Sequence, residues 1–261
     1  MDVEKLFSLK GRVALITGGS RGIGKMIARG FLASGAKVYI TARKAAQCDA
    51  TAAELQAQGY DCVSIPIDVS TVEGCKRLAE ELAKREDKLD ILVNNAGATW
   101  GAPAEDHPVE AWDKVMDLNV RAVFLISQAV GKRCMIPRGA GRIVNVASIA
   151  GLSGNGPAMT TLAYNTSKGA VINFTRALAG EWGRHGITVN ALAPGFFPSR
   201  MTRGTLARLG EDALAEKAPL RRLGDDDDLK GAAVLFASAA GKHITGQILA
   251  VDGGVSAVHG G

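Results

Sequence analysis

The sequence predicts an α/β fold: a single doubly wound domain of the Rossmann type, with a mostly parallel sheet of about seven strands flanked by helices. Short β-branched runs alternate with longer segments of helical period, which is the pattern of βαβ units. The first run, Arg12 to Thr17, is apolar enough for a strand buried on both faces. A chain of 261 residues with no break in this alternation is expected to form one domain over 1–261.

The remaining elements follow in a regular order. An apolar stripe after the first strand predicts an amphipathic helix, and Gly35 is expected to end it. Six further strands are separated by helix-length intervals. They are predicted at Lys37–Thr41, Cys62–Ile67, Leu89–Val93, Arg142–Ala147, Ile187–Ala191 and Gln247–Val251.

Two long helices are predicted at about Pro108–Arg133, with the proline in the first turn, and at about Thr161–Arg184. Both carry extra apolar residues such as Phe124 and Phe174, which suit either subunit contacts or ordinary core packing. The acidic run Asp225–Asp228 suits the positive N-terminal end of a further helix. Adjacent carboxylates on one turn point in different directions, so no metal is expected there.

Composition excludes several classes of protein. With 47% hydrophobic and 22% charged residues the chain is globular rather than disordered. The net charge of +5 is dispersed and aromatic residues are only 5%, which argues against nucleic acid. The apolar stretches are too short for a membrane span, and the start lacks a signal-peptide core. The four cysteines form no CxxC pair. We therefore expect a cytoplasmic protein without membrane contact, disulfides or bound metal, its cysteines acting as small buried hydrophobes.

A glycine-rich turn lies between the first strand and the first helix. Here backbone N–H groups and a helix N-terminus can meet a pyrophosphate, although the spacing is Gly-x-x-x-Gly-x-Gly. The residues predicted to hold a nucleotide here are Gly18, Ser20, Arg21, Gly22, Ile23 and Gly24. Arg43 stands where an NAD enzyme would place an acid, so with Arg21 it favours NADP(H) over NAD(H). The alternatives are a purely structural turn and solvated arginines.

Tyr164 and Lys168 are four residues apart within the second long helix, so they share one face, about 6 Å apart along the axis. A neighbouring ammonium group is expected to lower the pKa of the phenol and make it a better proton donor near neutral pH. Alone, the pair could also be an exposed helical pair.

Several motifs occur in a fixed order along the chain: TGGSRGIG at 17–24, Asp68-Val69, NNAG at 94–97, Asn119, Ser148, YNTSK at 164–168 and Pro194-Gly195. This combination resembles the short-chain dehydrogenase/reductase family from about residue 9 to residue 254. Within the family the chain is similar to bacterial 3-oxoacyl-(acyl carrier protein) reductases. The stretches NNAGATWGA and APGFFPSRMTR resemble the branch associated with rhamnolipid synthesis.

The resemblance implies roles for individual residues. Tyr164 would be the acid/base and Ser148 would polarise the substrate carbonyl. Lys168 would also bind the nicotinamide ribose, and Asn119 would hold a water that links the lysine to solvent. The remaining positions implied to contact the cofactor are Asp68, Val69, Asn94, Ala96, Gly97, Pro194, Gly195 and Ser199, the last standing where relatives usually have threonine. Asn95 is expected to link strands.

The resemblance also implies an NADP(H)-dependent ketone reductase that acts on a 3-oxoacyl thioester or a similar ketone, and a homotetramer or homodimer built on the two long helices. A substrate lid is expected at about 196–223. Between Ser199 and Arg222 it carries six basic and three acidic residues, which suits either a substrate on an acidic carrier protein or coenzyme A, or a solvated helix face.

Other functions remain open at this point. One alternative is a polyol, sugar-acid or other alcohol dehydrogenase of the same family that works in the oxidative direction. Another is a non-catalytic nucleotide sensor on the same fold. The segment between Ser148 and Tyr164 is longer than is usual in the family, which is expected to alter substrate preference before it alters the mechanism.

Overall fold

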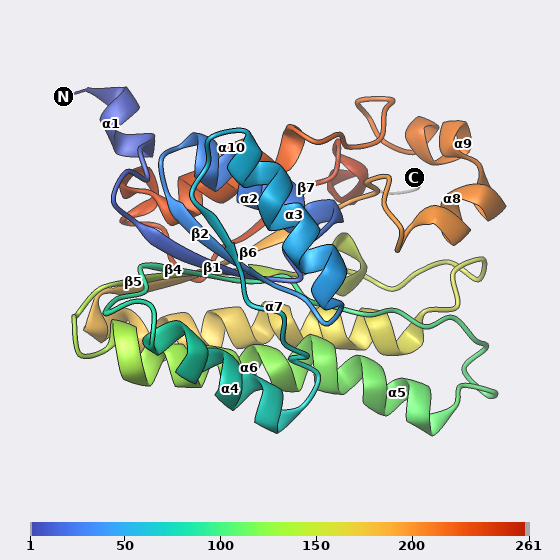
Figure 1. The fold of residues 1–261 in the computed structure, drawn as a ribbon. Coiled ribbons are helices and arrows are strands. Elements are labelled where there is room, and N and C mark those ends of the chain that lie inside the picture. The colour runs from blue at the N-terminus through green and yellow to red at the C-terminus, as the bar shows by residue number, and fades with distance from the viewer. Residues whose placement is uncertain (1, 259–261) are drawn as a thin grey trace.

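A twisted sheet of seven parallel strands forms the centre of the computed structural model, which describes residues 2–258 (Figure 1). The strands are β1 (Val13–Thr17), β2 (Lys37–Thr41), β3 (Cys62–Ser64), β4 (Ile91–Asn94), β5 (Gly141–Val146), β6 (Ile187–Pro194) and β7 (Ile248–Val251). Their order across the sheet is β3-β2-β1-β4-β5-β6-β7. The predicted fold class is confirmed.

Helices cover both faces of the sheet (Figure 1). On one face lie α2 (Gly22–Ala33), α3 (Ala45–Ala57) and α10 (Asp228–Ala237), with α1 (Val3–Phe7) at the N-terminal end. The other face is covered by α4 (Val72–Ala83), α5 (Val109–Met116), α6 (Ala122–Val130) and α7 (Leu162–Trp182). The short helices α8 (Arg203–Leu209) and α9 (Glu211–Glu216) lie beyond one edge of the sheet.

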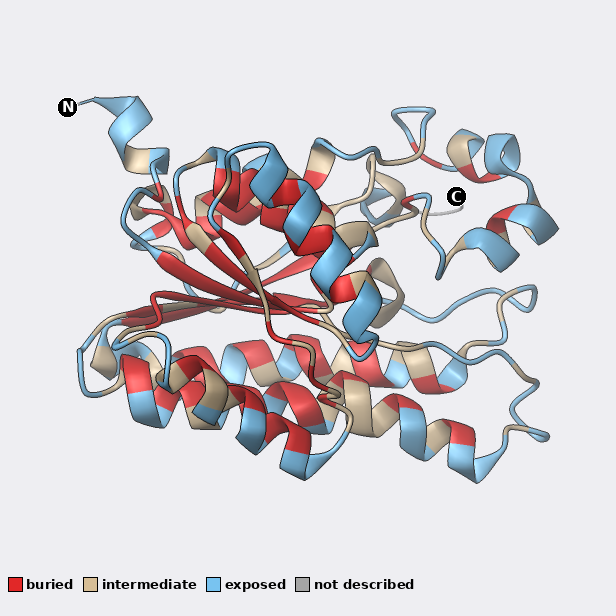
Figure 2. Cartoon of the chain, in the orientation of Figure 1, coloured by how far each residue is buried: buried red, intermediate tan, exposed pale blue. Residues whose placement is uncertain are grey.

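Each helix layer encloses a core against the sheet, and the buried strands run between the two (Figure 2). Helix α2 shows how the sequence produces this packing. Ile27 and Phe31 lie one turn apart and are fully buried against the sheet. The helix ends as predicted, because Gly35 adopts a φ of +93°, a conformation that side-chain-bearing residues rarely accept.

The sheet has a topological switch point between β1 and β4. The chain winds outward from β1 to β2 and β3, then returns to the other side of β1 with β4. Loops that follow neighbouring strands therefore diverge above the carboxyl edge at this point, and such crevices are where open α/β sheets bind ligands.

The first long helix differs from its prediction. Instead of one helix over 108–133, α5 and α6 are separated by a π-helical turn at Asp117–Arg121, and α6 runs into a second one at Gly131–Met135. A π turn inserts one residue into the helical period and shifts the face that the helix presents. Pro108 precedes the first turn as the N-cap instead of lying within it.

The ends of two further elements can be compared with their predictions, and one of them differs. Strand β3 stops at Ser64 instead of Ile67, because Pro66 has no N–H to offer a neighbouring strand. Helix α10 begins at Asp228 with Asp227 as its N-cap, as the acidic run predicted.

All four cysteines are free and buried, as expected. Burial raises the pKa of the Cys62 thiol to about 12, so this group is inert at neutral pH. Among residues 2–258, no helix combines the length and the apolarity that crossing a membrane requires.

Candidate active site

A cleft of about 620 Å³ opens at the carboxyl edge of the sheet, above the switch point. Its walls come from the segments that follow β1 to β6, together with α5, the π turn after it and α7. Of the residues predicted to form the site, all except Asn94 and Asn119 line this cleft. They are Gly18, Ser20, Arg21, Gly22, Ile23, Gly24, Arg43, Asp68, Val69, Ala96, Gly97, Ser148, Tyr164, Lys168, Pro194, Gly195 and Ser199.

Within the glycine-rich turn, Gly24 is packed too tightly for a side chain. A Cβ on Gly24 would lie 2.4 Å from the carbonyl oxygen of Gly18 and 2.4 Å from Asn95 Nδ2. Gly22, which has a φ of +51°, opens α2, and no side chain caps the free N–H groups of the first helical turn. The turn thus presents unpaired backbone donors and the positive end of a helix dipole to the cleft, a suitable environment for a phosphate.

Ser148, Tyr164 and Lys168 meet at the other end of the cleft. Ser148 follows β5 and caps a 3-10 turn at Ile149–Gly151. That turn packs directly on α7, since a Cβ on Gly151 would lie 2.5 Å from the carbonyl carbon of Lys168. Close packing of this turn therefore fixes the serine beside the helix that carries the tyrosine and the lysine.

Lys168 is a buried cation without an acidic partner within residues 2–258. Its side chain donates one hydrogen bond, from Nζ to the carbonyl oxygen of Val146 at 2.7 Å. The ammonium group lies 5.6 Å from the centre of the Tyr164 ring. Burial lowers the pKa of Lys168 to about 8. The two remaining N–H donors are available to a ligand in the cleft.

The pKa of Tyr164 differs from the sequence-based expectation. In the protein alone it is raised, because burial outweighs a hydrogen bond from the neighbouring Ser148 that acts in the opposite direction. Lys168 lies over the face of the ring, and burial disfavours its charged form by lowering its pKa. The simple argument from helical spacing omitted the cost of desolvating the phenolate.

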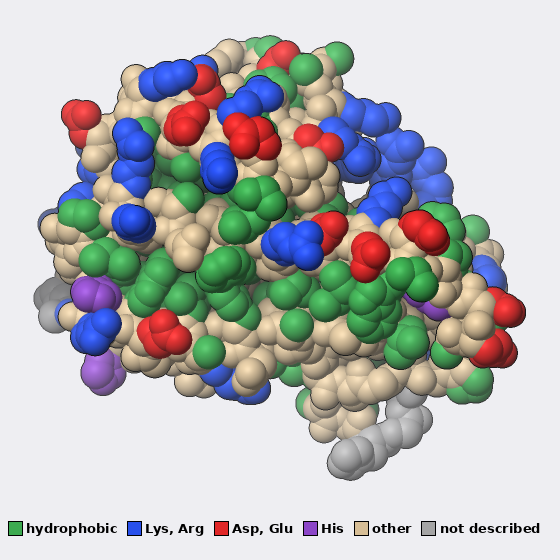
Figure 3. Space-filling model, turned by 90° about the horizontal axis from the view of Figure 1, so that it is seen from below, with side chains coloured by type: hydrophobic (Ala, Val, Ile, Leu, Met, Phe, Trp, Pro, Cys, Tyr) green, Lys and Arg blue, Asp and Glu red, His purple; other side chains and the backbone are tan. Residues whose placement is uncertain are grey.

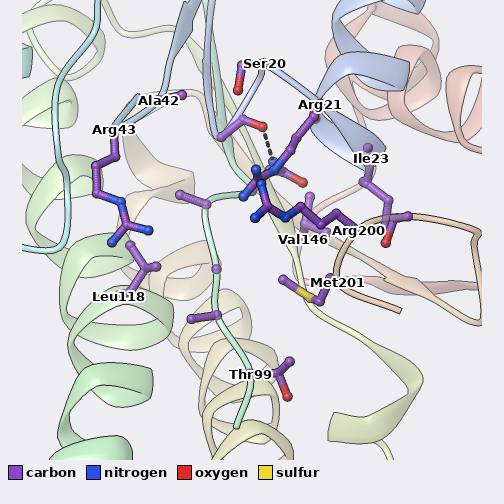
Figure 4. Close-up of a pocket in the computed structure, with 18 of the residues that line it drawn as sticks. Ser20, Arg21, Ile23, Ala42, Arg43, Thr99, Leu118, Val146, Arg200 and Met201 are labelled. Atoms are coloured by element: carbon purple, nitrogen blue, oxygen red, sulfur yellow. Dashed lines mark hydrogen bonds between the residues drawn. The ribbon is translucent and has the colours of Figure 1, made fainter. Parts of the chain in front are cut away.

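The cleft is strongly basic. Six of its lining residues are cationic, namely Arg21, Arg43, Lys44, Lys114, Lys168 and Arg200, whereas Asp68 is the acidic one. Figure 4 shows Arg43 entering from the β2 side and Arg21 from the glycine-rich turn. Within residues 2–258 neither guanidinium forms an ion pair, and Arg21 makes only a long contact of 3.4 Å with Gln47. The site can therefore bind a polyanion.

Asn94 is not among the residues that line the cleft, and its predicted contact with the cofactor stays a prediction. Its side chain is buried in the sheet, where Nδ2 donates to Ser127 Oγ at 3.0 Å and to Asn145 Oδ1 at 2.9 Å. Asn95 borders the cleft instead and links strands, since its Nδ2 donates to the carbonyl oxygen of Thr17 at 2.8 Å. Alternation along β4 turns one of two adjacent asparagines inward.

Asn119 lies behind the cleft wall, in the π turn between α5 and α6. Its Oδ1 accepts from the N–H of Ala98 at 2.8 Å, and its Nδ2 donates to the carbonyl oxygen of Ala98 and to Ser167 Oγ, each at 2.9 Å. Ser167 in turn donates to the carbonyl oxygen of Tyr164 at 2.7 Å. The chain of contacts holds the loop after β4 against the turn of α7 that carries the tyrosine.

Some lining residues were missed by sequence reasoning, notably Lys44, Trp100, Lys114, Arg200 and Met201. Trp100 lies in the stretch NNAGATWGA, and Arg200 and Met201 lie in APGFFPSRMTR within the predicted lid, but none of the three was assigned to the site. For Lys44 the available signal was its position directly after Arg43. Arg200 and Met201 belong to the segment before α8, and Figure 4 shows both reaching over the cleft.

The chain has relatives of two kinds. Residues 18–256 match the family model described as enoyl-(acyl carrier protein) reductase. A rhamnolipids biosynthesis 3-oxoacyl-[acyl-carrier-protein] reductase from Pseudomonas aeruginosa is 44% identical over 95% of this chain and 97% of its own. A gluconate 5-dehydrogenase from Gluconobacter oxydans is 40% identical over 98% of this chain and 99% of its own.

Solved structures of both kinds of relative are similar to this chain. The Pseudomonas aeruginosa RhlG/NADP active-site complex superposes with a TM-score of 0.90 at 44% identity, covering 97% of this chain and 99% of its own. A gluconate 5-dehydrogenase from Burkholderia cenocepacia in complex with NADP and tartrate gives 0.93 at 35% identity, covering 98% and 100%. The fold, the ordered motifs and these matches agree with the resemblance found in the sequence, and the chain belongs to the short-chain dehydrogenase/reductase family.

Proposed function

We propose that this protein is an NADP(H)-dependent ketoreductase that reduces the ketone of a 3-oxoacyl thioester to a secondary alcohol. The observation that carries the proposal is the convergence of Ser148, Tyr164 and Lys168 at one end of a basic cleft whose other end is a glycine-rich turn. The similarity to named 3-oxoacyl reductases supports the substrate class.

The residues of the cleft fit a phosphorylated dinucleotide. The glycine-rich turn leaves room beside unpaired backbone donors, since a Cβ on Gly22 would meet only Ser199, at 3.7 Å. Arg43 and Arg21 offer guanidinium groups suited to a 2′-phosphate. Relatives solved with NADP support this choice of cofactor. The glycine-rich turn would hold the pyrophosphate, and Lys168 and the segment from Pro194 to Ser199 would hold the nicotinamide half.

Bound NADPH supplies the hydride for the ketone carbon. The chain's own residues do the rest. Ser148 donates a hydrogen bond to the carbonyl oxygen and holds it beside the phenol, which orients the ketone. Tyr164 gives its proton to the same oxygen as negative charge develops there. Lys168 places a positive charge near the phenolate that remains, which compensates for the burial of that negative charge.

The roles of two residues behind the reacting groups follow from their contacts. Asn119 connects the loop after β4 to the Tyr164 turn, and we propose that it keeps the tyrosine in place as well as serving a water-linked path for its reprotonation. Asp68 and Val69, at the end of the segment after β3, would contact the adenine.

We propose that residues 196–223, which include α8, α9 and the segments that flank them, act as the substrate lid. Arg200 and Met201 from this lid line the cleft. The exposed arginines of α8 suit a negatively charged carrier such as coenzyme A. A sugar acid would instead place its carboxylate on the basic cleft, which is the alternative that the gluconate dehydrogenases support.

The decisive test is the Tyr164→Phe variant. It removes the proton donor and leaves the aromatic packing, so turnover of a 3-oxoacyl thioester should fall by about 10³-fold while the Kd for NADPH stays within about twofold. NADPH consumption and fluorescence titration measure the two quantities. Retention of most of the wild-type rate would refute the assignment, and a wild-type preference for gluconate over thioesters would favour the alternative substrate.

We also propose that the protein acts in the cytoplasm as a homodimer or homotetramer. Free, buried cysteines fit a reducing compartment. Figure 3 views the α4–α7 layer from outside and shows hydrophobic side chains grouped across it. Phe124 on α6 contributes to the apolar surface of this layer and is 46% exposed. A monomer by light scattering would contradict this assembly.

A further inference from the structure

A second, smaller hollow lies at the amino edge of the sheet, where β1, β4 and β5 begin and α10 ends. Its volume is about 80 Å³. It is lined by Arg12, Asp90, Ile91, Ala140, Gly141, Arg142, Ala237 and Ser238. None of these residues lines the active-site cleft, which lies at the opposite, carboxyl edge of the same parallel strands. The hollow is therefore separate from the site of the proposed reaction.

Arg142, the second residue of β5, is a partly buried cation that no acid neutralises within residues 2–258. Its guanidinium makes one hydrogen bond there, from Nη1 to the carbonyl oxygen of Gly141 at 2.9 Å. Burial lowers the pKa of Arg142, and the positive charge of Arg12 lowers it further. A guanidinium carries several N–H donors in a planar fork, so most of them remain available to a ligand in the hollow.

Asp90 is the acidic residue of the hollow, and its carboxylate already has several partners. Its Oδ1 accepts from Arg12 Nη1 at 3.2 Å and from Arg138 Nη2 at 3.0 Å. Its Oδ2 accepts from the N–H of Val13 at 2.9 Å and lies 3.5 Å from Lys88 Nζ. Three cations thus share one negative charge. The acid of the hollow is therefore saturated with donors.

The charges around the hollow do not balance. Among the residues that line it or pair with Asp90, four are cationic, namely Arg12, Lys88, Arg138 and Arg142. Asp90 is the acid of this group, which therefore keeps a net positive charge. Because β4 lies between β1 and β5 in the sheet, Arg12 and Arg142 reach the hollow from either side of Asp90. An anion between the two guanidinium groups would offset their repulsion.

The size and the donors of the hollow indicate the class of anion. A volume of about 80 Å³ admits a few waters or one small oxyanion and is too small for a nucleotide. The planar fork of a guanidinium matches the oxygens of an oxyanion and offers no such match to a spherical halide ion.

We propose that this hollow is a binding site for a small oxyanion such as inorganic phosphate, held by the guanidinium groups of Arg12 and Arg142. The bound anion ties the starts of three neighbouring strands together. It stabilises the folded state, because the site exists in the native protein and not in the unfolded chain. The proposal goes beyond the reaction in the cleft and does not depend on it.

The test uses inorganic phosphate as the probe and the Tm of the full-length protein without cofactor as the readout. The rise in Tm between sodium chloride and phosphate of about 20 mM at equal ionic strength should be about 2–4 °C smaller in Arg142→Gln than in the wild type, as expected for the loss of a ligand present at several times its Kd. Phosphate in the basic cleft would raise the Tm of both proteins alike, because the variant leaves the cleft unaltered. Arg176→Gln is the matched control and should show the full rise. It removes the same charge from an exposed position on α7, where the Arg176 side chain makes no polar contact within residues 2–258.

A second measurement needs no variant and decides the question even if Arg142→Gln does not fold. Crystals of the wild type soaked in tungstate, a heavy tetrahedral oxyanion, should show anomalous density between Arg12 and Arg142. The proposal is overturned if such density is absent from the hollow, or if the wild type and a folded Arg142→Gln show the same phosphate-dependent rise in Tm. An equal loss of that rise in Arg176→Gln would also overturn it, because the effect would then belong to net charge and not to the hollow.

Discussion

Replacing the buried lysine should stabilise the protein while it destroys the activity. Lys168 is 5% exposed and its pKa falls from 10.5 to about 8 on burial. At about 1.36 kcal/mol for each tenfold change in proton affinity, the charged side chain costs the folded state on the order of 3 kcal/mol. Methionine fills a similar volume without the charge. It leaves the Val146 carbonyl without its hydrogen bond, which costs about 1–3 kcal/mol. The free energy of unfolding of Lys168→Met should therefore exceed that of the wild type by up to about 2 kcal/mol at pH 7.

The pH dependence distinguishes this cause from better packing. The folded pKa of Lys168 lies below the unfolded one, so between these values the unfolded chain binds more protons and stability rises with pH. Between pH 7 and pH 9.5 the titration of Lys168 should raise the free energy of unfolding of the wild type by about 2 kcal/mol. Lys168→Met lacks this group, so its free energy of unfolding should not rise from this cause. The stability difference between Lys168→Met and the wild type should therefore be about 2 kcal/mol smaller at pH 9.5 than at pH 7.

Urea denaturation of the two ligand-free proteins at pH 7 and pH 9.5 measures this difference. Lys242→Met is the control, because it makes the same substitution at an exposed position. The reasoning is refuted if Lys168→Met is less stable than the wild type at pH 7, or if the difference between the two proteins is the same at both pH values.

Three more predictions concern other parts of the molecule. Arg43→Asp should lower the NADPH over NADH preference in kcat/KM by about 10-fold to 100-fold, since it replaces the guanidinium offered to the 2′-phosphate with a repelling charge; an unchanged ratio would exclude Arg43 from that contact. Gly24→Ala should weaken NADPH binding in fluorescence titration and lower the Tm, because the new Cβ would lie 2.4 Å from the Gly18 carbonyl oxygen. The exposed Gly180→Ala in α7, where a Cβ meets nothing within 4 Å, should instead raise stability by about 0.5–1 kcal/mol. Asp90→Asn should cost about 1–3 kcal/mol in urea denaturation at pH 7. Burial favours the neutral acid at Asp90, but hydrogen bonds from the Val13 N–H and from Arg138 keep its pKa below the ordinary value. The wild type should therefore lose stability as the pH falls through this lowered pKa, and Asp90→Asn should not.

The sequence predicted those features that depend on local patterns. Strand β1, the amphipathic face of α2 and the turn at Gly35 all follow from apolar spacing and backbone freedom, and the structure has them where they were expected. The ordered motifs placed Ser148, Tyr164 and Lys168 in one site because loops after parallel strands meet at one edge. These features require no knowledge of contacts between distant segments.

What could not be predicted depends on such contacts. The π turn that carries Asn119 is not encoded by helix propensity, and it coincides with the contacts of Asn119 to the backbone of Ala98. Asn94 and Asn95 are adjacent residues of the same type. The direction in which each side chain points from the sheet determines which one borders the cleft. The raised pKa of Tyr164 depends on how deeply the finished site is buried.

Two buried charges at opposite ends of the sheet show what the fold retains for stability and what it retains for chemistry. Asp90 precedes β4 at the amino edge, where it lies within 4 Å of Arg12, Lys88 and Arg138 and accepts a backbone N–H. Lys168, near the carboxyl edge, has a single carbonyl as its partner. A buried charge with several partners recovers its desolvation cost, whereas one without a counter-ion does not. Removing Asp90 should therefore weaken the fold and removing Lys168 should strengthen it. That opposite sign is expected only if Lys168 is retained for the reaction in the cleft, because packing alone would favour an apolar side chain at its position.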